Sequence, residues 1–196
     1  LNALDDHTTG AITATISDND AATLVGLSDD NGNNVLTISL TDATASVANI
    51  ITINGKTAGT LTVSSTTITG TVAALNTVYA SSGISGLGNE AITLSDSSVD
   101  AANLNTLDAY TSGAINAASI TTLTGSTSAQ ATARASSGII NLDGSGGGGG
   151  SNPEGSVTAS YLNTLDADTS GTVDASAVTT ITGTVAALNT VYASSG

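Results

Sequence analysis

Internal repetition constrains the fold of this chain more than any other feature of its sequence. Residues 104–125 return at 162–183 with most letters unchanged, and a shortened form of the same segment stands at 1–14. A degenerate copy covers residues 50–70. Such copies are typical of repeat architectures, in which each unit buries its apolar face against the next unit. We therefore expect an array of similar units rather than one closed globular core.

A second sequence repeat indicates the length of the repeating unit. Residues 66–83 recur letter for letter at 179–196. Within this long period, Leu-Asn-Thr triplets begin at Leu75 and Leu104, and again at Leu162 and Leu188. We take the interval between successive triplets as the length of one coil. Each coil is predicted to contain a short strand, a short helix, a glycine stop and a second extended piece.

Local signals within each coil agree with this reading. β-branched alternation at residues 120–124 indicates a strand. A hydroxyl residue that can accept a free backbone N–H is expected to begin each helix: Thr71, Ser98, Ser126 and Thr184. A glycine in the left-handed conformation is expected to end each helix: Gly83, Gly113, Gly138, Gly171 and Gly196.

The supply of large side chains also favours thin stacked units. The chain has no Phe, Trp, Met or Cys and only four Tyr, so Ile, Leu, Val and Ala must fill its interior. Short helices rich in Thr and Asn are marginal alone, and stacking must stabilise them. We therefore predict a solenoid-like array of short parallel β-strands with short helices, a β-rich and elongated α/β solenoid.

The charge excludes two classes of partner. The chain has sixteen acidic residues and only two basic ones, Lys56 and Arg134, which gives a formal net charge of −14. Nucleic-acid phosphates and anionic membrane surfaces would be repelled by such a chain. No apolar run is long enough to cross a bilayer, so we expect no membrane insertion.

Three parts are expected along the chain. Residues 1–143 form a repeat array that opens in mid-repeat and carries a degenerate insert at 16–34, with a weak helix at 20–27. Residues 144–155 are a Gly/Ser-rich linker or loop. Residues 156–196 are a further repeat that stops in mid-repeat. We expect a window on a longer array, or a subunit whose ends are completed by neighbouring copies, head to tail.

One copy contains a calcium-loop pattern. Asp166, Asp168 and Ser170 stand at the first, third and fifth places, where EF-hand loops carry oxygen ligands, and Gly171 stands at the sixth. Asp174 adds a further carboxylate. The pattern departs from the motif at the twelfth place, which requires Glu and holds Ala177, and at the third place of the sister copies, which holds Tyr110, His7 or Lys56. Two readings remain open: a weak calcium site, or a turn that favours Asp and Gly.

Regular threonines suggest a second binding function. Thr-x-Thr pairs could form an ice-binding face, and they stand at 67/69, 122/124 and 180/182. Ice binding needs such pairs on adjacent coils, whereas these lie about two coils apart. Their β propensity explains them better.

No group of residues indicates catalysis. His7 is the only histidine and cysteine is absent, which argues against a transition-metal site and a histidine-based triad. The glycine run at 146–150 lacks the Lys of a phosphate-binding loop. We therefore predict that the protein is not an enzyme, with no catalytic residues and no cofactor apart from calcium.

The wording of the repeat, LNTLDAxTSGxVDASxVTTITGTxAxLNTxYASSGIxGLGNEAITLSD, resembles repeats in very large extracellular proteins of marine bacteria, cyanobacteria especially. Those proteins are grouped with adhesins and haemolysin-type calcium-binding proteins. The resemblance covers the chain except residues 16–34 and 144–155. It implies an extracellular, cell-surface structural protein, an adhesin or a self-assembling filament subunit. The alternative is a module that binds calcium or a surface glycan.

Overall fold

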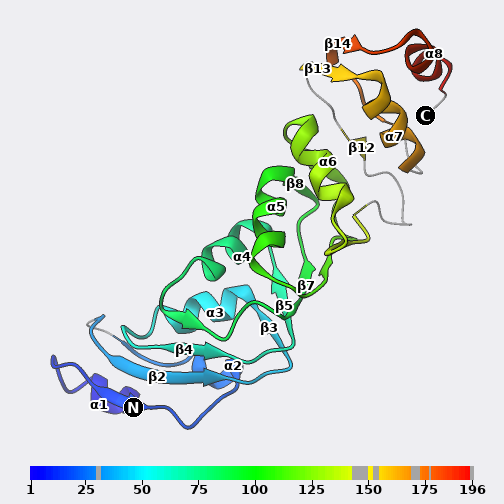
Figure 1. Cartoon of the computed structure of the whole chain (residues 1–196). Helices are drawn as coiled ribbons and strands as arrows, with labels where there is room; N and C mark the ends of the chain where they lie inside the picture. The colour runs from blue at the N-terminus through cyan, green and yellow to red at the C-terminus, as the bar shows by residue number, and fades with distance from the viewer. Residues whose placement is uncertain (30–31, 143–149, 152–154, 169–172, 177, 195–196) are drawn as a thin grey trace. The chain divides into compact units, whose positions relative to one another are not determined.

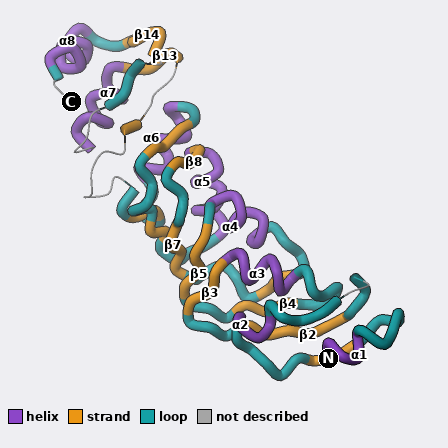
Figure 2. The backbone as a smooth tube through the Cα atoms, turned by 180° about the vertical axis from the view of Figure 1, so that it is seen from behind, coloured by secondary structure: helices purple, strands orange, loops and turns teal. Residues whose placement is uncertain are grey.

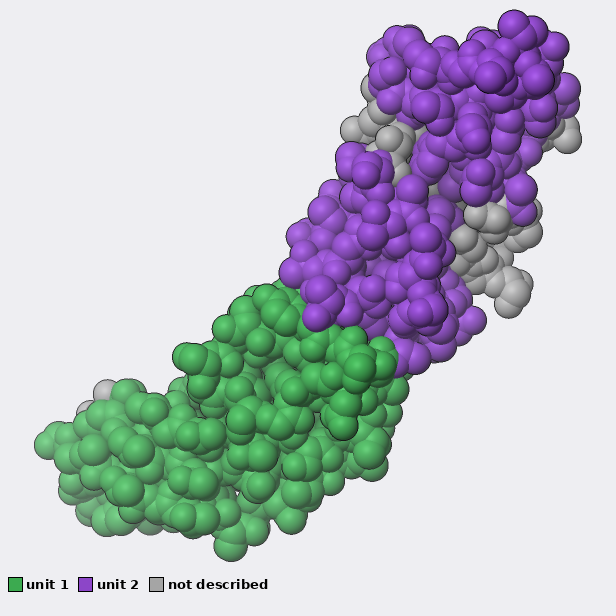
Figure 3. Space-filling model, viewed as in Figure 1, with its two compact units in different colours: residues 1–93, 110–113 green, residues 94–109, 114–196 purple. Residues whose placement is uncertain are grey.

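The chain has a mixed α/β fold of short helices and short parallel strands (Figure 1 and Figure 2). This computed structural model describes residues 1–29, 32–142, 150–151, 155–168, 173–176 and 178–194. The chain divides into two compact units: unit 1 comprises residues 1–93 with 110–113, and unit 2 comprises residues 94–109 with 114–196 (Figure 3). The prediction of short parallel strands joined by short helices is confirmed.

Unit 1 contains two parallel sheets and four helices within its described residues. Its elements are α1 (Asn2–Asp5), β1 (Thr13–Thr15), α2 (Ala21–Leu24), β2 (Val35–Leu40), β3 (Thr44–Ser46), α3 (Val47–Asn54), β4 (Leu61–Val63), β5 (Thr67–Gly70), α4 (Val72–Tyr79), β6 (Ile84–Ser85) and β7 (Ala91–Leu94). One sheet has the order β1-β2-β4-β6, and in the other β3, β5 and β7 lie side by side. Helices α3 and α4 pack beside each other, as both ribbon views show.

Unit 2 continues with the same kinds of element. They are β8 (Ser98–Asp100), α5 (Ala101–Tyr110), β9 (Ile115–Asn116), β10 (Thr122–Thr124), α6 (Thr127–Ala135), β11 (Ile139–Ile140), β12 (Gly150–Ser151), β13 (Gly155–Thr158), α7 (Ala159–Asp168), β14 (Val178–Thr182) and α8 (Val185–Ala193). Strand β10 pairs with β8 and β12, β9 with β11, and β13 with β14, all in parallel. Helix α7 packs beside α8. The linker prediction at 144–155 falls largely outside the described residues.

Apart from β10 and β12, strand partners lie closer together in sequence than the coil length expected from the Leu-Asn-Thr triplets. In unit 1 Thr13 lies opposite Val35, and in unit 2 Ser98 lies opposite Thr122. Both intervals are shorter than the interval between successive triplets, so the predicted coil length was wrong for these strand pairs. The interval between triplets measures the number of residues from one helix to the next. From α4 to α5 this number includes the loop at 86–90 between β6 and β7.

Aliphatic side chains fill the interior, as the composition requires. Strand β2 alternates exposed and buried positions, with Leu36, Ile38 and Leu40 inside. The fully buried large side chains elsewhere in unit 1 are Leu24, Ile50, Ile53, Leu61, Ile68, Leu75 and Ile92, and in unit 2 they include Leu104 and Leu107. Each buried Leu or Ile contributes roughly 1.5–3 kcal/mol.

Helix starts follow the sequence with one exception. Thr71, Ser126 and Thr184 accept N–H bonds at the starts of α4, α6 and α8, as predicted. The prediction for Ser98 was wrong, because Ser98 lies in β8 and Asp100 accepts the N–H groups of Ala102 and Asn103. Asp and Ser compete for the same role, and here the carboxylate stands directly before the helix.

The glycine stops were predicted for the wrong reason. Gly83, Gly113 and Gly138 are not among the residues with positive φ. Gly113 is needed for another reason, because a Cβ there would overlap the backbone carbonyl of Glu90. A Cβ on Gly83 or Gly138 would meet only the end of a side chain, the Oδ1 of Asn54 at 3.0 Å or the carboxylate of Asp108. Gly171 and Gly196 lie outside the described residues.

Candidate functional site

The residues of the predicted calcium loop are only partly described, and the described carboxylates of Asp166 and Asp174 already have hydrogen-bond partners. Asp166 lies on α7, where its Oδ2 accepts the hydroxyl of Ser194 at 2.7 Å. Asp174 is exposed, and its Oδ1 accepts the N–H of Ser176 at 2.9 Å. Hydrogen bonds from Ser176 lower the pKa of Asp174. Asp168 ends α7 but its side chain is not described, and Ser170 lies outside the described residues.

Within the described ranges, no group of three or more His, Cys, Asp and Glu side chains could hold a metal ion. Since the loop itself is only partly described, the calcium site stays a prediction. The same part of the chain contains no helix that is long and apolar enough to span a membrane.

The aspartate of the Leu-Asn-Thr-Leu-Asp motif has a recurrent structural role. Asp108 accepts the hydroxyl of Ser136 at 2.8 Å, 28 residues further along the chain. Asp166 and Ser194 stand at the same spacing. In the first copy the corresponding Asp5 accepts the amide of Asn34 at 2.7 Å. The motif aspartate therefore links one segment to the next in all three copies.

The asparagine of the motif makes a parallel contact. Asn105 and Asn163 each donate their side-chain amide to a backbone carbonyl 24 residues ahead, at Ala129 and Ala187, at 2.9 and 3.0 Å. Asn2 donates in the same way to the carbonyl of Gly26 at 2.7 Å. An amide that leaves water needs such a partner, because a lost hydrogen bond inside a protein costs about 1–3 kcal/mol.

Two buried polar groups in unit 1 were not anticipated from the sequence. Asn34 is fully buried and its Oδ1 accepts the N–H of Ile12 at 2.9 Å, in addition to its bond with Asp5. Glu90 is 2 % exposed and accepts the hydroxyl of Tyr79 at 2.7 Å and the N–H of Gly88 at 2.8 Å. Glu90 is the one charged residue between positions 84 and 95, and this was the one sequence signal for its buried carboxyl.

Two contacts fix the side chain of Tyr79: ring stacking and the hydrogen bond to Glu90. Its ring stacks on Tyr110 with centroids 5.8 Å apart and planes 14° apart. Burial, with help from the hydrogen bond to Glu90, raises the pKa of Tyr79 far above its ordinary value. The phenol therefore keeps its proton and acts as a fixed hydrogen-bond donor, which is a structural role.

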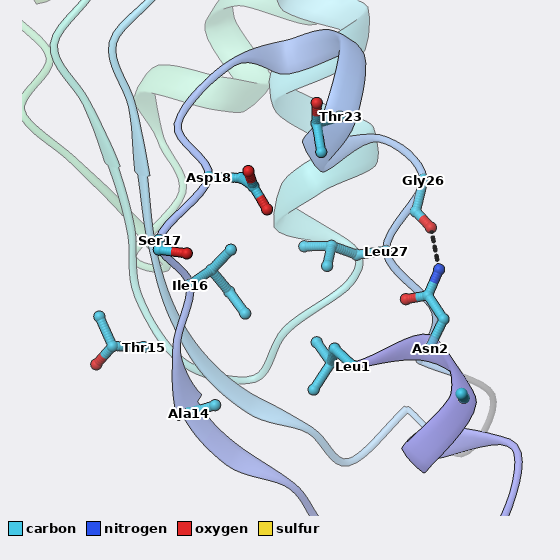
Figure 4. Close-up of a pocket in the computed structure, with 11 residues that line it drawn as sticks. Leu1, Asn2, Ala14, Thr15, Ile16, Ser17, Asp18, Thr23, Gly26 and Leu27 are labelled. Atoms are coloured by element: carbon cyan, nitrogen blue, oxygen red, sulfur yellow. Dashed lines mark hydrogen bonds between the residues drawn. The ribbon is translucent and has the colours of Figure 1, made fainter.

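A hollow lies in unit 1 beside α1 (Figure 4). It has a volume of about 590 Å³ and is open to solvent on one side. Leu1, Ile16 and Leu27 point into it, and Asp18 is the one ionisable side chain among its lining residues. Its other polar side chains are the amide of Asn2 and the hydroxyls of Thr15, Ser17 and Thr23, and none of the lining side chains is His, Lys, Arg or Glu.

Comparisons with known proteins add no relative: no family model, no curated protein and no solved structure matches the chain.

Proposed function

We propose that the protein is a non-catalytic structural protein, a solenoid of coils that serves as an extracellular adhesin or as a subunit of a surface filament. In this proposal each coil is one turn of strand and helix, and successive coils stack through their parallel strands. The extracellular, cell-surface setting comes from the resemblance of the repeat sequence to large marine bacterial surface proteins.

One observation carries the proposal. The polar residues of the repeated motif make hydrogen bonds to segments 24 to 29 residues ahead, from Asn2, Asp5, Asn105, Asp108 and Asn163. The strands pair in parallel at nearly the same spacing. A motif whose chemistry is directed at stacking fits an array that extends by adding units.

Duplication of one long repeat tests this proposal. A variant carrying residues 50–103 twice should fold, because the second copy presents the next coil with the same contacts. Small-angle X-ray scattering should report a longer maximum dimension, and the denaturant m-value should rise with the added surface. A matched insertion that repeats only residues 50–89 breaks the spacing and should fail to fold.

A compact particle with an unchanged maximum dimension, or loss of folding when 50–103 is duplicated, would contradict the solenoid. The adhesin and filament versions are separated by negative-stain electron microscopy of the purified protein, with calcium and with chelator. Filaments with an axial repeat support the filament subunit, and single particles that bind cell-surface glycans support the adhesin.

A further inference from the structure

The outer face of the sheet β1-β2-β4-β6 in unit 1 carries hydroxyl side chains on neighbouring strands. Strand β2 alternates exposed and buried positions, and its exposed positions include two hydroxyl residues. The pairing register places such residues of adjacent strands opposite one another, namely Thr15 with Thr37, Ser39 with Thr62, and Thr62 with Ser85. The hydroxyls therefore form rows that cross the strands.

A sixth hydroxyl residue continues one of these rows. Thr60 directly precedes Leu61, whose partner is Ile38, so Thr60 lies opposite Thr37. We define the hydroxyl face by its two rows: Thr15, Thr37 and Thr60 in the first, and Ser39, Thr62 and Ser85 in the second. Thr62 is half-buried and the other five residues are exposed. Strands β2 and β4, which carry the middle of both rows, lie side by side in Figure 1.

This arrangement supplies what the threonine pairs recognised in the sequence lack. The pairs at 67/69, 122/124 and 180/182 belong to three different sheets. The hydroxyl pairs at 13/15, 37/39 and 60/62 instead stand at β1, β2 and β4, which are neighbours in one sheet. The structure therefore contains hydroxyl pairs on adjacent strands, at positions that the spacing of Thr-x-Thr pairs did not identify.

β propensity explains the threonines of the hydroxyl face but not its serines. Threonine is among the residues enriched in strands, and serine is not. Ser39 and Ser85 nevertheless flank Thr62, and the Oγ1 of Thr62 lies 3.2 Å from the Oγ of Ser85. Ser46 of β3, in the other sheet of unit 1, has a structural use, because its hydroxyl accepts an N–H at the start of α3. On the hydroxyl face, the shared property is the hydroxyl group itself.

The spacing of the hydroxyl face is set by the sheet. Neighbouring strands lie about 4.7–4.9 Å apart, and every second residue along a strand recurs after roughly 6.6 Å. The pairings of β1 with β2, β2 with β4 and β4 with β6 contain no register shift, so the rows are continuous. Oxygen atoms at the surface of hexagonal ice repeat over comparable distances in two directions. Water held by these hydroxyls therefore occupies positions that an ice surface can continue.

The side chains of the hydroxyl face also disfavour other ligands. None of its six residues is charged, although the chain has a formal net charge of −14. Charged side chains orient water around themselves and would disturb an ordered layer. Tyrosine is the only aromatic residue type in the chain, and none stands among the six. The face therefore offers no ring on which the apolar side of a sugar could pack.

We propose that the hydroxyl face binds ice. Water bridging to fixed hydroxyls is nearly as favourable as a direct hydrogen bond, and the rigid sheet orders that water before ice arrives. A further strand beside β1 would lengthen the rows without covering them, because strands pair through their backbone edges. The inference goes beyond the proposed structural function and does not depend on it.

Partition into a growing ice crystal tests the inference with the full chain. Ice that grows slowly excludes proteins that do not bind it and takes up those that do. Thr37→Tyr places a large ring in the middle of the hydroxyl face, and strands accept tyrosine well. The matched control is Thr93→Tyr, the same change at an exposed position of β7 in the other sheet of unit 1. The unaltered chain and Thr93→Tyr should enter the ice and show thermal hysteresis, and Thr37→Tyr should lose both properties.

Far-UV circular dichroism and Tm verify that the variants fold, and Thr15→Tyr, in the same row, serves if Thr37→Tyr does not fold. An unaltered chain that stays in the liquid overturns the inference, as does a folded Thr37→Tyr variant that still enters the ice. Equal loss in Thr93→Tyr would move the site to the other sheet and overturn it too. Binding to crystalline cellulose that Thr37→Tyr abolishes would assign the face to a polysaccharide instead. The solenoid is tested separately, by the duplication experiment.

Discussion

Helices α4 and α8 have the same sequence and the same start, but only α4 is buried. Thr71 accepts the N–H of Ala74 at 3.3 Å, and Thr184 accepts the N–H of Ala187 at 3.2 Å. Local sequence therefore determines the helix and its cap in both places. The buried face of α4 comes from packing beyond the helix. The pair separates local from tertiary stabilisation within one molecule, and matched substitutions in the two helices test the difference.

The largest difference is expected for the central leucine. Leu75 is fully buried, so Leu75→Ala removes apolar contacts and leaves a cavity, at a cost of roughly 2–5 kcal/mol in the free energy of unfolding. Leu188 is half-buried at the same place in α8, and Leu188→Ala should cost less than about 1 kcal/mol. Urea unfolding of both variants, followed by circular dichroism, checks this. Equal losses would contradict the difference in packing.

The second comparison concerns two glycines of Thr-x-Gly turns in unit 1. A Cβ on Gly113 would overlap the backbone carbonyl of Glu90, so Gly113→Ala forces the two segments apart, at roughly 1–3 kcal/mol. A Cβ on Gly10 would meet only its own turn, at 3.4 Å from the Oγ1 of Thr8. Gly10→Ala should change stability by less than about 0.5 kcal/mol. A Tm shift as large for Gly10→Ala as for Gly113→Ala would contradict the role of close backbone approach.

The third comparison is between Tyr79 on α4 and Tyr192 at the same place on α8. Tyr79→Phe leaves the buried Glu90 carboxyl without its phenolic donor and should cost about 1–2 kcal/mol. Tyr192→Phe should have no measurable effect on a monomer, because that ring is exposed. Chemical unfolding at pH 7 gives both values. A cost for Tyr192→Phe that appears only at high protein concentration would belong to association rather than to folding.

Tyr79 also sets a dependence on pH. Burial and the bond to Glu90 raise its pKa in the folded state, so the folded chain keeps a proton that the unfolded chain releases near pH 10. The free energy of unfolding therefore falls as the pH rises above about 10, and Tyr79→Phe should flatten this fall. Tyr161, whose pKa burial also raises, retains its own part of the slope.

The smallest difference is expected for the motif aspartates. Asp108→Asn weakens the bond from Ser136 and should cost about 1 kcal/mol, whereas Asp166→Asn weakens the more exposed bond from Ser194 and should cost less. Calcium discriminates between the two interpretations of residues 166–174: if they form only a turn, millimolar calcium should leave the Tm of the unaltered chain unchanged. A Tm that rises with calcium, and no longer rises in Asp166→Asn or Asp168→Asn, would instead establish the calcium loop.

The sequence was most informative where a residue acts on its own segment. Strand β2 and the caps at Thr71, Ser126 and Thr184 follow from local rules. The reasons for Gly113 and Asn34 lie in distant segments, in the carbonyl of Glu90 and the carboxyl of Asp5. Local patterns cannot report such contacts.

The candidate site divides in the same way. The Asp-x-Asp spacing at 166–168 was visible in the sequence. The hydrogen bond that Asp166 accepts from Ser194 was not, because Ser194 lies 28 residues further along the chain. The buried pair of Tyr79 and Glu90 gave no motif, because a turn and the short strand β6 separate its members. Repetition itself was the strongest guide, since it identified Asp108 and Asp166 as equivalent before either contact was known.

The short interval between strand partners, as from Thr13 to Val35 or from Ser98 to Thr122, also bears on how the chain is made. Folding slows as contacts span more of the chain, and contacts this short in range favour fast folding. A strand emerging from the ribosome meets its partner soon after the next helix has been added. The polypeptide can therefore fold behind the site of synthesis, one segment after another, and its folding time does not have to grow with its length.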